Sequence, residues 1–315
     1  MLLAFVFLAM LFLGVPVAFA LALATIFAFI EIGDPMLLML VPQRMFTTME
    51  DYILLAIPFF IMAGEIMNRS LLTDKLVRFV GNVVGNFRGG LAHTVIVSEI
   101  FFSGITGSAV ADMVALGGVL IPAMEKEKYG KEFSTAVVAS SAVLGPIIPP
   151  SIPMLIYASV MNVSVAGLFV AGILPGIVMA LCLMIMAGLI AAKRGFGVKR
   201  AFPGFIVLGV SFIQAIPALF MPVLIMGGVL GGFFTPTQAS VVAVLYGLAV
   251  GFLFYKTLKP SDIAPILKAT IRSTAMIIFI LAAARVFSWL ITYTKLVDHS
   301  TEVVAVMRQI MESGN

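Results

Sequence analysis

The sequence predicts an all-α, polytopic membrane protein, and two observations carry this prediction. Of the 315 residues, 62% are hydrophobic and 11% are charged, and the mean hydropathy is +1.17. A soluble domain covers its surface with far more charge. Apolar stretches of about 20 residues, the length at which a helix spans a bilayer, recur along nearly the whole chain. No soluble domain fits between these stretches, so we expect a single membrane domain over residues 1–315.

The net charge of +4 does not indicate nucleic acid as a partner, because lysine and arginine occur in short segments between the apolar runs. In such segments they determine topology, since cytoplasmic loops of membrane proteins are rich in Lys and Arg. The basic segments are Arg69–Arg88, Lys126–Lys131, Lys193–Arg200 and Lys256–Arg272.

The loops at 31–51, 162–164 and 233–236 are not rich in lysine and arginine. Basic loops are expected on the cytoplasmic side and the other loops on the opposite side. The two kinds alternate along the chain in this way only if residues 91–124 return to the cytoplasmic side, either as a hairpin or as two full spans. We therefore expect a multi-pass protein of the bacterial inner membrane with a cytoplasmic N-terminus.

Six apolar runs are expected to cross the bilayer: Leu2–Ile30, Tyr52–Asn68, Ser164–Ala192, Phe205–Phe233, Thr237–Tyr255 and Ser273–Tyr293. The run at 205–233 is expected to combine a lateral segment with a span, and its Pro217 and Pro222 are expected to kink it. Arg69–Arg88 has an apolar and a polar side, which is typical of a helix that lies along the membrane. Lys256–Arg272 is expected to be a basic linker, and Lys295–Met311 is amphipathic.

Residues 91–124 are expected to form a re-entrant helical hairpin. Leu91–Phe102 would reach about 18 Å as a helix, too short for a bilayer core of about 30 Å. The small and polar residues Ser103–Ser108 follow, and a second apolar piece ends at Met124. A hairpin that enters, turns on the Ser103–Ser108 cluster at mid-membrane and leaves on the same side accounts for both pieces.

The run Phe133–Met161 is expected to be a broken helix. Gly145–Ser151 interrupts it, and the prolines in and beside this segment cannot donate backbone hydrogen bonds and restrict the residue before them. These prolines are Pro146, Pro149, Pro150 and Pro153. The chain is therefore expected to unwind near the middle of the span.

The order span, breaker and amphipathic segment occurs at 52–88 and again at 273–312. The first copy runs outside to inside and the second inside to outside, which is an inverted repeat of the kind found in secondary transporters. The predicted architecture is thus that of an inverted-repeat ion transporter with a re-entrant hairpin and a broken helix.

Unwound backbone at membrane depth is tolerated only where it is buried in protein or lines an aqueous cavity. Two adjacent interruptions that face each other would offer hydroxyls and freed carbonyls to a small hard cation such as Na⁺, and helix N-termini to an anionic solute. Small residues that allow close packing and prolines that kink a helix would explain each segment alone, but their combination favours a site. The residues expected to bind Na⁺ or substrate are Ser103, Thr106, Gly107, Ser108, Gly145, Pro146, Pro149, Pro150 and Ser151, with Na⁺ held through Ser103, Ser108 and Gly145.

Three ionisable residues inside apolar runs are further candidates, because such groups are costly in a membrane and commonly functional. Glu99 precedes the expected hairpin tip and Asp112 follows it, while Arg285 lies in the middle of the last span. For Arg285 a structural ion pair is the alternative to a role in substrate binding.

Two of these segments carry a resemblance to a known family. Ser103–Asp112 (SGITGSAVAD) and Gly145–Ile152 (GPIIPPSI) resemble signatures of the large membrane subunit of TRAP (tripartite ATP-independent periplasmic) transporters. The same is true, in the same order along the chain, of Ala56–Phe60 with Ala63–Glu65, Gly89–Ala92 and Gly232–Thr237. The resemblance extends to about residue 295.

The resemblance implies an elevator-type, Na⁺-coupled importer of an organic acid such as a C4-dicarboxylate, sialic acid or a similar carboxylate. It also implies a small membrane subunit and a periplasmic solute-binding protein as partners, and no cofactor besides Na⁺ as the coupling ion. In these terms residues 2–90 provide scaffold spans and an amphipathic arm, and 91–162 the transport core. Residues 164–255 join the repeats, and 256–315 begin a second, incomplete repeat.

The sequence departs from the family at two places. Gln238 stands where the family usually has an acidic residue, and the family's second hairpin and second broken helix are expected beyond Asn315, where this chain stops. We therefore expect a chain truncated at its C-terminus, or one completed by another chain.

Three other classes of function fit these features less well than a transporter. The sequence contains no nucleophile–base constellation, metal-ligand spacing or phosphate loop, so an enzyme is not expected. An ion channel also uses re-entrant segments, but the inverted repeat with amphipathic arms favours a transporter. A non-transporting remnant that only packs against a partner subunit is the third alternative.

Overall fold

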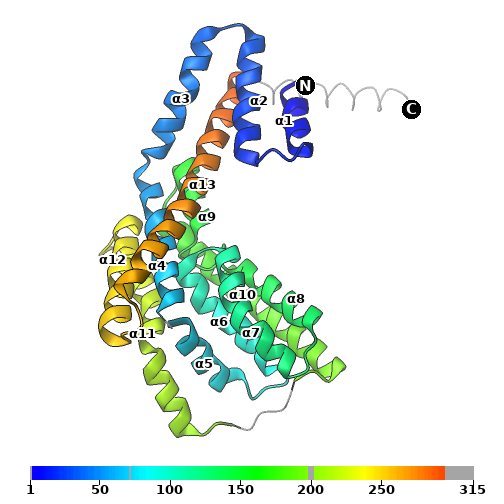
Figure 1. Ribbon diagram of the computed structural model, residues 1–315, viewed down its shortest axis with the longest axis vertical. Coiled ribbons are helices and arrows are strands. Elements are labelled where there is room, and N and C mark those ends of the chain that lie inside the picture. Colours follow the sequence, from blue (N-terminus) through cyan, green and yellow to red (C-terminus); the bar gives the residue numbers. More distant parts are fainter. Residues whose placement is uncertain (1, 71, 198–201, 295–315) are drawn as a thin grey trace, which may run out of the picture. The chain divides into compact units, whose positions relative to one another are not determined.

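The computed structural model describes residues 2–70, 72–197 and 202–294 (Figure 1). Within these ranges all regular structure is helical, as the sequence predicts, and no strand occurs. Five of the helical segments are long and apolar enough to cross a membrane, and they coincide with five of the six expected spans: Tyr52–Arg69, Val165–Arg194, Phe205–Leu230, Pro236–Phe254 and Pro260–Tyr293.

The chain forms two compact units. The smaller unit consists of Met1–Asp51 and Ala275–Asn315, and the larger one of Tyr52–Thr274. The described helices of the smaller unit are α1 (Leu2–Phe12), α2 (Val17–Ile32), α3 (Pro35–Met49) and the second part of α13 (Pro260–Tyr293).

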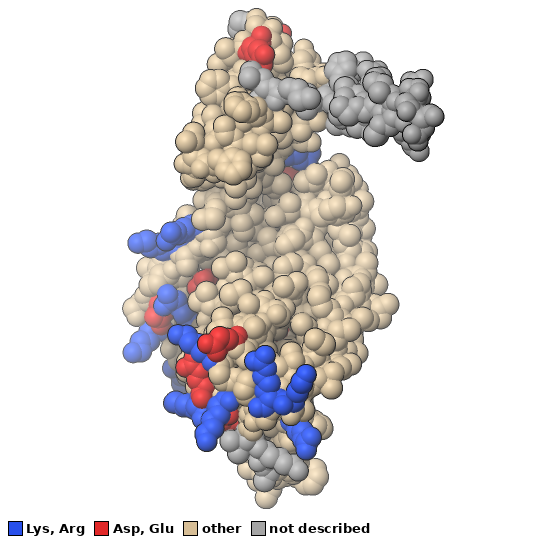
Figure 2. Space-filling model, turned by 90° about the vertical axis from the view of Figure 1, so that its right-hand side faces the viewer, with Lys and Arg blue, Asp and Glu red and all other residues tan. Residues whose placement is uncertain are grey.

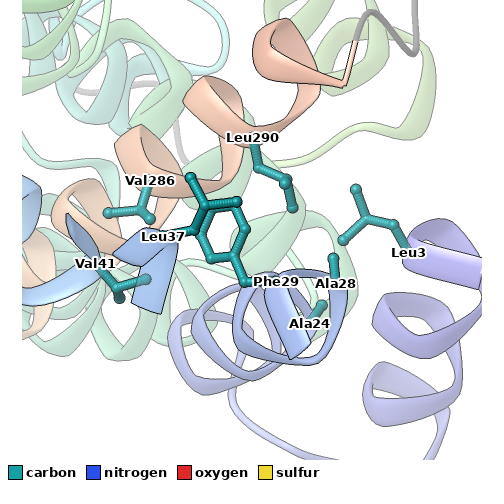
Figure 3. Packing of buried hydrophobic residues seen from close by; sticks show 8 residues of the cluster. All are labelled: Leu3, Ala24, Ala28, Phe29, Leu37, Val41, Val286 and Leu290. Carbon is teal, nitrogen blue, oxygen red and sulfur yellow. The ribbon is translucent and has the colours of Figure 1, made fainter. Parts of the chain in front are cut away.

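The smaller unit is held together by an apolar core to which all four of these helices contribute. The ring of Phe29 lies at its centre and is 5.5 Å from the ring of Trp289, while small alanines on α2 let neighbouring helices approach closely. Figure 3 shows the eight core residues, which are Leu3, Ala24, Ala28, Phe29, Leu37, Val41, Val286 and Leu290.

The predicted single span over Leu2–Ile30 is wrong, because the chain turns between α1 and α2 and the two helices pack against each other. Gly14 adopts a left-handed φ of 78°, and Pro16 lacks the amide hydrogen that would continue the helix. The apolar run was long enough for one crossing, and these two breakers divide it.

The expected loop at 31–51 is also wrong, since α3 occupies most of it. Asp34 caps this helix by accepting a hydrogen bond of 2.9 Å from the amide of Met36, and Pro35 stands at the first helical position, where its fixed φ favours a helix start. The local start signals outweigh the charge content on which the expectation of a loop rested.

The larger unit contains the helices that surround the two expected interruptions. α4 follows a 3₁₀ turn at Tyr52–Leu55, and a π turn at Val250–Phe254 extends α12. The helices are α4 (Ala56–Arg69), α5 (Leu72–Val84), α6 (Gly90–Thr106), α7 (Ala109–Lys126), α8 (Lys131–Ser141), α9 (Ile152–Met161), α10 (Val165–Arg194), α11 (Phe205–Leu230) and α12 (Pro236–Ala249), together with the start of α13.

The expected amphipathic segment after α4 is confirmed as α5, which buries Leu72, Leu76 and Val80. It packs on α11 and α6, and Lys75 Nζ donates a hydrogen bond of 3.1 Å to the side chain of Gln214 on α11.

Two further expectations are corrected in the larger unit. α11 is one continuous helix through Pro217 and Pro222, and not a lateral segment joined to a span. Interior prolines are tolerated in membrane helices where neighbours satisfy the backbone, and Tyr246 on α12 donates a 2.9 Å hydrogen bond to the carbonyl of Pro217.

The basic linker expected at Lys256–Arg272 is mostly helical, because α13 already begins at Pro260. Asp262 accepts a hydrogen bond of 2.8 Å from the amide of Lys259, and this acidic residue in the first turn favours a helix start. The amphipathic segment expected at 295–311 lies outside the described residues.

The connections beside the basic segments meet at one end of the larger unit. The amide of Leu91 at the start of α6 donates to the hydroxyl of Tyr129 just beyond α7, at 3.3 Å. The ring of Tyr129 lies 6.2 Å from that of Phe196 beyond α10. Figure 2 shows lysine and arginine side chains gathered towards the lower end of this unit, beside a broad face without charged residues. α6 and α7 thus start and finish at the same end, as a hairpin requires.

Candidate functional site

The hairpin formed by α6 and α7 turns on two residues. Gly107 ends α6 in the left-handed conformation, with φ of 57°, and Ser108 caps α7. Helices commonly end with a left-handed glycine, because glycine has no Cβ to clash.

The interruption expected over Ser103–Ser108 is therefore shorter than predicted, since residues 103–106 continue α6. The Ser103 hydroxyl donates a hydrogen bond of 2.6 Å to the Glu99 carbonyl one turn earlier, which lets a serine remain inside a helix. Gly104 is also helical, where a side chain would approach Pro222 of α11 at 3.2 Å.

α10 provides a measure of how far the hairpin reaches. Gly188 of α10 packs against His93 near the start of α6, and Gly176 packs against Ile148 in the second interruption. α10 rises about 18 Å between these two contacts. α6 itself has 17 residues and rises about 25 Å, less than the roughly 30 Å of a bilayer core.

The second interruption, between α8 and α9, is confirmed. α8 ends at Ser141, a 3₁₀ turn covers Ala142–Leu144, and α9 begins at Ile152. Ser151 holds the unwound segment, because its hydroxyl donates to the Pro146 carbonyl at 2.6 Å and accepts from the Met154 amide at 3.3 Å.

The hairpin tip and the second interruption are in contact, as the sequence analysis expected of facing breaks. A Cβ on Gly107 would lie 2.8 Å from the Pro150 carbonyl oxygen and 2.9 Å from the Ile152 amide nitrogen. A Cβ on Gly104 would lie 3.5 Å from the carbonyl oxygen of Pro149. Gly107 is thus needed where the two backbones approach this closely, whereas a Cβ on Gly104 would be in ordinary van der Waals contact with the Pro149 oxygen.

Asp112 connects the two segments. Its Oδ1 accepts a hydrogen bond from the Thr106 hydroxyl. Its Oδ2 lies beside Gly145, where a Cβ would be only 2.8 Å away. The first turn of α7 therefore directs a carboxylate at the residue that opens the second interruption.

Asp112 is completely buried, and Glu99, which is 1% exposed, places its carboxyl group beside that of Asp112. Within the described residues, Oδ2 of Asp112 and Oε1 of Glu99 have no hydrogen-bond partner. A buried carboxylate oxygen without a donor is costly, so a bound cation or proton is needed to offset the charge.

The four expected hydroxyl ligands are employed to different degrees. Ser103 and Thr106 are buried donors to a carbonyl and to Asp112, and Ser151 both donates and accepts. Ser108 is half-buried and accepts one long hydrogen bond, 3.5 Å, from an amide in the first turn of α7. Its oxygen is the least committed of the four.

The donor set suits a hard cation. Carboxylate, hydroxyl and carbonyl oxygens meet at the tip, and such ligands are those that Na⁺-like ions take in transporters. No group of three or more His, Cys, Asp or Glu side chains that could hold a metal occurs in the part of the chain that the structure describes.

The remaining candidate is Arg285. It belongs to the smaller unit and lines a cavity of about 550 Å³ between α3 and α13, which also contains Arg44 stacked 4.0 Å above the Trp289 ring.

Sequence reasoning assigned no role in the site to Gly64 on α4. A Cβ at this position would lie 2.9 Å from the Thr106 side chain, so Gly64 leaves the room in which Thr106 reaches Asp112. A small residue opposite the tip is the signal that could have identified it.

A comparison with protein families agrees with these features. The family model described as the DctM component of the tripartite ATP-independent periplasmic transporter matches residues 4–311.

Individual relatives give the same result. The sialic acid TRAP transporter large permease protein SiaM of Vibrio cholerae is 35% identical, over 93% of this chain and 68% of that protein. The C4-dicarboxylate TRAP transporter large permease protein DctM of the same species is 34% identical, over 93% and 69%. The 2,3-diketo-L-gulonate TRAP transporter large permease protein YiaN of Escherichia coli is 34% identical, over 90% and 66%. This chain thus spans about two thirds of the length of these relatives.

The resemblance drawn from the sequence motifs is therefore confirmed. The chain belongs to the DctM component family of TRAP transporters, and it is a multi-pass membrane protein of a transporter family and not an enzyme.

Proposed function

We propose that the chain is the membrane permease subunit of a Na⁺-coupled secondary active transporter that imports an organic acid across the bacterial inner membrane. Its partners are a small membrane subunit and a periplasmic solute-binding protein, and its N-terminus is cytoplasmic. The observation that carries this proposal is the contact between the hairpin tip and the second interruption, where the Asp112 carboxylate is buried with one oxygen unpartnered.

Na⁺ is the ion that fits this contact. Asp112 supplies the charge that attracts a cation, while the Ser108 hydroxyl and the backbone beside Gly145 supply neutral oxygens. Interrupted helices at membrane depth coordinate coupling ions in this way in other transporters. Thr106 then positions the Asp112 carboxylate through its hydrogen bond, whereas Ser103 donates to the backbone carbonyl of Glu99 within α6.

The organic acid would bind at the same contact. α7 and α9 both begin there, and helix N-termini carry partial positive charge that favours a carboxylate. The relatives named for sialic acid, C4-dicarboxylate and 2,3-diketo-L-gulonate support a carboxylate as the solute. A bound Na⁺ would further stabilise the carboxylate of the solute. Because each then binds better in the presence of the other, the Na⁺ gradient can drive uptake of the organic acid.

Alternating access of the elevator type is part of this proposal, and it requires the hairpin and the second interruption to move together. Glycines of α10 contact the hairpin and the second interruption at Gly172, Gly176 and Gly188. The side chains of Met154 and Ile148 occupy the room that Gly172 and Gly176 leave, so these segments approach α10 closely. α6 has 17 residues and rises about 25 Å, less than a bilayer core of about 30 Å, so the tip would stop inside the bilayer.

Reconstitution in proteoliposomes tests this function. The chain, with its small subunit and binding protein, should accumulate the solute when Na⁺ is high outside, and dissipating the Na⁺ gradient should abolish accumulation. One net charge moved through 100 mV is worth about 2.3 kcal/mol, or about fiftyfold accumulation. Saturable, solute-dependent counterflow is expected; conduction without saturation would indicate a channel, and co-purification without uptake would indicate a non-transporting remnant.

A further inference from the structure

A cavity of about 700 Å³ in the larger unit is lined by α5 and by both helices of the hairpin. On one side it is lined by Asp74, Lys75 and Arg78 of α5, and on the other by Val119, Leu120 and Ala123 of α7. The polar face of α5 therefore looks towards the hairpin across a space that protein side chains do not fill.

The α5 wall is net positive, with two basic side chains and one acidic one. Lys75 is half-buried and lines the cavity, and its ammonium group donates a hydrogen bond to Gln214 on α11, which lies outside the cavity lining. Asp74 and Arg78 are exposed. This wall favours an anion, and the positive end of the α5 dipole adds to the effect because Asp74 and Lys75 lie in its first turn.

The opposite wall is apolar. Val119 is 42% exposed and faces the cavity beside Leu120 and Ala123. Thr94 also lines the cavity, but its hydroxyl donates to the Gly90 carbonyl of its own helix at 2.8 Å. A small hydrated anion would use the charged wall alone and leave this apolar wall in contact with water, at a cost proportional to its area.

The cavity lies at the base of the hairpin. Leu91 at the start of α6 and Ala123 near the end of α7 both line it, and this is the end of the larger unit where the basic segments gather. Basic residues at that level meet the headgroups of the cytoplasmic leaflet, whose lipids are partly anionic.

We propose that this cavity binds one anionic phospholipid of the cytoplasmic leaflet. Its phosphate lies against Lys75 and Arg78, and the first part of its acyl chains lies along Val119, Leu120 and Ala123. A lipid satisfies both walls at once, whereas a free phosphate or a solute carboxylate satisfies one. The site is separate from the Asp112 cluster and does not depend on which solute the chain transports.

Native mass spectrometry of the purified chain in detergent tests this proposal. Three probes are titrated: dioleoylphosphatidylglycerol, dioleoylphosphatidylcholine and glycerol 3-phosphate. One phosphatidylglycerol should bind more tightly than phosphatidylcholine, and glycerol 3-phosphate should bind far more weakly. Lys75→Gln and Arg78→Gln should each weaken phosphatidylglycerol binding about fivefold. A basic residue near the membrane surface contributes about 1 kcal/mol to the attraction of anionic lipid, which corresponds to this factor.

The matched control is Lys131→Gln, which removes the same charge from an exposed position on α8 outside the cavity and should leave binding unaltered. Ala123→Phe fills the space beside the apolar wall without changing the charge. It should weaken the binding of both phosphatidylglycerol and phosphatidylcholine. Size-exclusion chromatography and circular dichroism identify any variant that fails to fold.

Equal phosphatidylglycerol binding by the wild type and the Lys75→Gln, Arg78→Gln double variant would overturn the proposal. So would glycerol 3-phosphate binding as tight as that of the lipid, which would indicate a free-anion site, or an equal loss in Lys131→Gln, which would indicate unspecific attraction. Because the readout is lipid binding and not uptake, its result is independent of the proposed transport function.

Discussion

The hairpin turn between α6 and α7 and the interruption between α8 and α9 lie in contact, yet the chain leaves the helix differently at the two places. At the tip a single left-handed glycine, Gly107, reverses the chain, and Ser108 starts the next helix at once. The other interruption runs from Gly145 to Ser151, and prolines that lack amide hydrogens remove the demand for hydrogen-bond partners along it.

This difference indicates which kind of substitution would disrupt each segment. The tip depends on the absence of a side chain, because Gly107 faces the backbone of Pro150 and Ile152 at close range. The longer interruption depends on the presence of one, because the Ser151 hydroxyl joins its two ends. We expect the tip to respond to added volume and the interruption to lost hydrogen bonds.

The largest effect is expected for Gly107→Ala. The left-handed φ costs a non-glycine residue about 1–2 kcal/mol, and a Cβ 2.8 Å from the Pro150 oxygen must push the two segments apart. Overpacking of this kind costs about 1–3 kcal/mol. The variant should unfold at a clearly lower temperature in detergent and should lose Na⁺-driven uptake.

The matched control for this substitution is Gly118→Ala on α7, where a Cβ would meet nothing within 4 Å. At an exposed helix position alanine is more favourable than glycine by about 1 kcal/mol. The melting temperature of Gly118→Ala should therefore stay level or rise. If Gly107→Ala melted and transported like Gly118→Ala, the close contact of the tip would be refuted.

The next effect is expected for Asp112→Asn, which keeps the shape of the side chain and removes its charge. A bond from a charged oxygen contributes about 1.5–3 kcal/mol, so the Na⁺ concentration needed for half-maximal stabilisation should rise ten- to a hundredfold. The measurement is the melting temperature of the purified chain across a Na⁺ series at constant ionic strength with K⁺, since a ligand that binds only the folded state stabilises it by an amount that grows with the logarithm of its concentration relative to its Kd.

Glu132→Gln on α8 is the control, because this carboxylate is exposed and lies in another helix. Its Na⁺ dependence should match that of the wild type. An unaltered Na⁺ dependence in Asp112→Asn would remove Asp112 from the cation site, even if uptake fell for another reason.

Most of the helical architecture could be predicted from apolar length and from proline and glycine positions. The two failures in the smaller unit share one cause, because local helix breakers and helix start signals there outweigh composition. Gly14 and Pro16 divide an apolar run of spanning length, and Asp34 with Pro35 starts a helix in a stretch that was expected to be a loop. Neither signal changes the mean hydropathy of its segment, so hydropathy alone detects neither the helix break nor the helix start.

The candidate site was predicted in place but not in detail. Periodicity and prolines located the two interruptions. Which group each hydroxyl bonds depends on the three-dimensional arrangement of the helices, which one sequence does not contain. Ser103 bonds its own helix, while the carboxylate of Asp112, which the sequence offered only as an additional candidate, reaches the opposite segment. Gly64 matters because of its neighbour Thr106, a contact between distant positions.

The smallest effects are expected for the two capping serines, and they separate structural from ligand roles. Ser151→Ala removes a cap and a bond to the Pro146 carbonyl, each worth about 1 kcal/mol, so it should mainly lower the melting temperature. Ser108→Ala removes one long cap bond of 3.5 Å and should hardly alter melting without Na⁺. If Ser108 is a Na⁺ ligand, the same variant should need several-fold more Na⁺ for half-maximal stabilisation and uptake; an unchanged Na⁺ requirement would leave Ser108 as a helix cap alone.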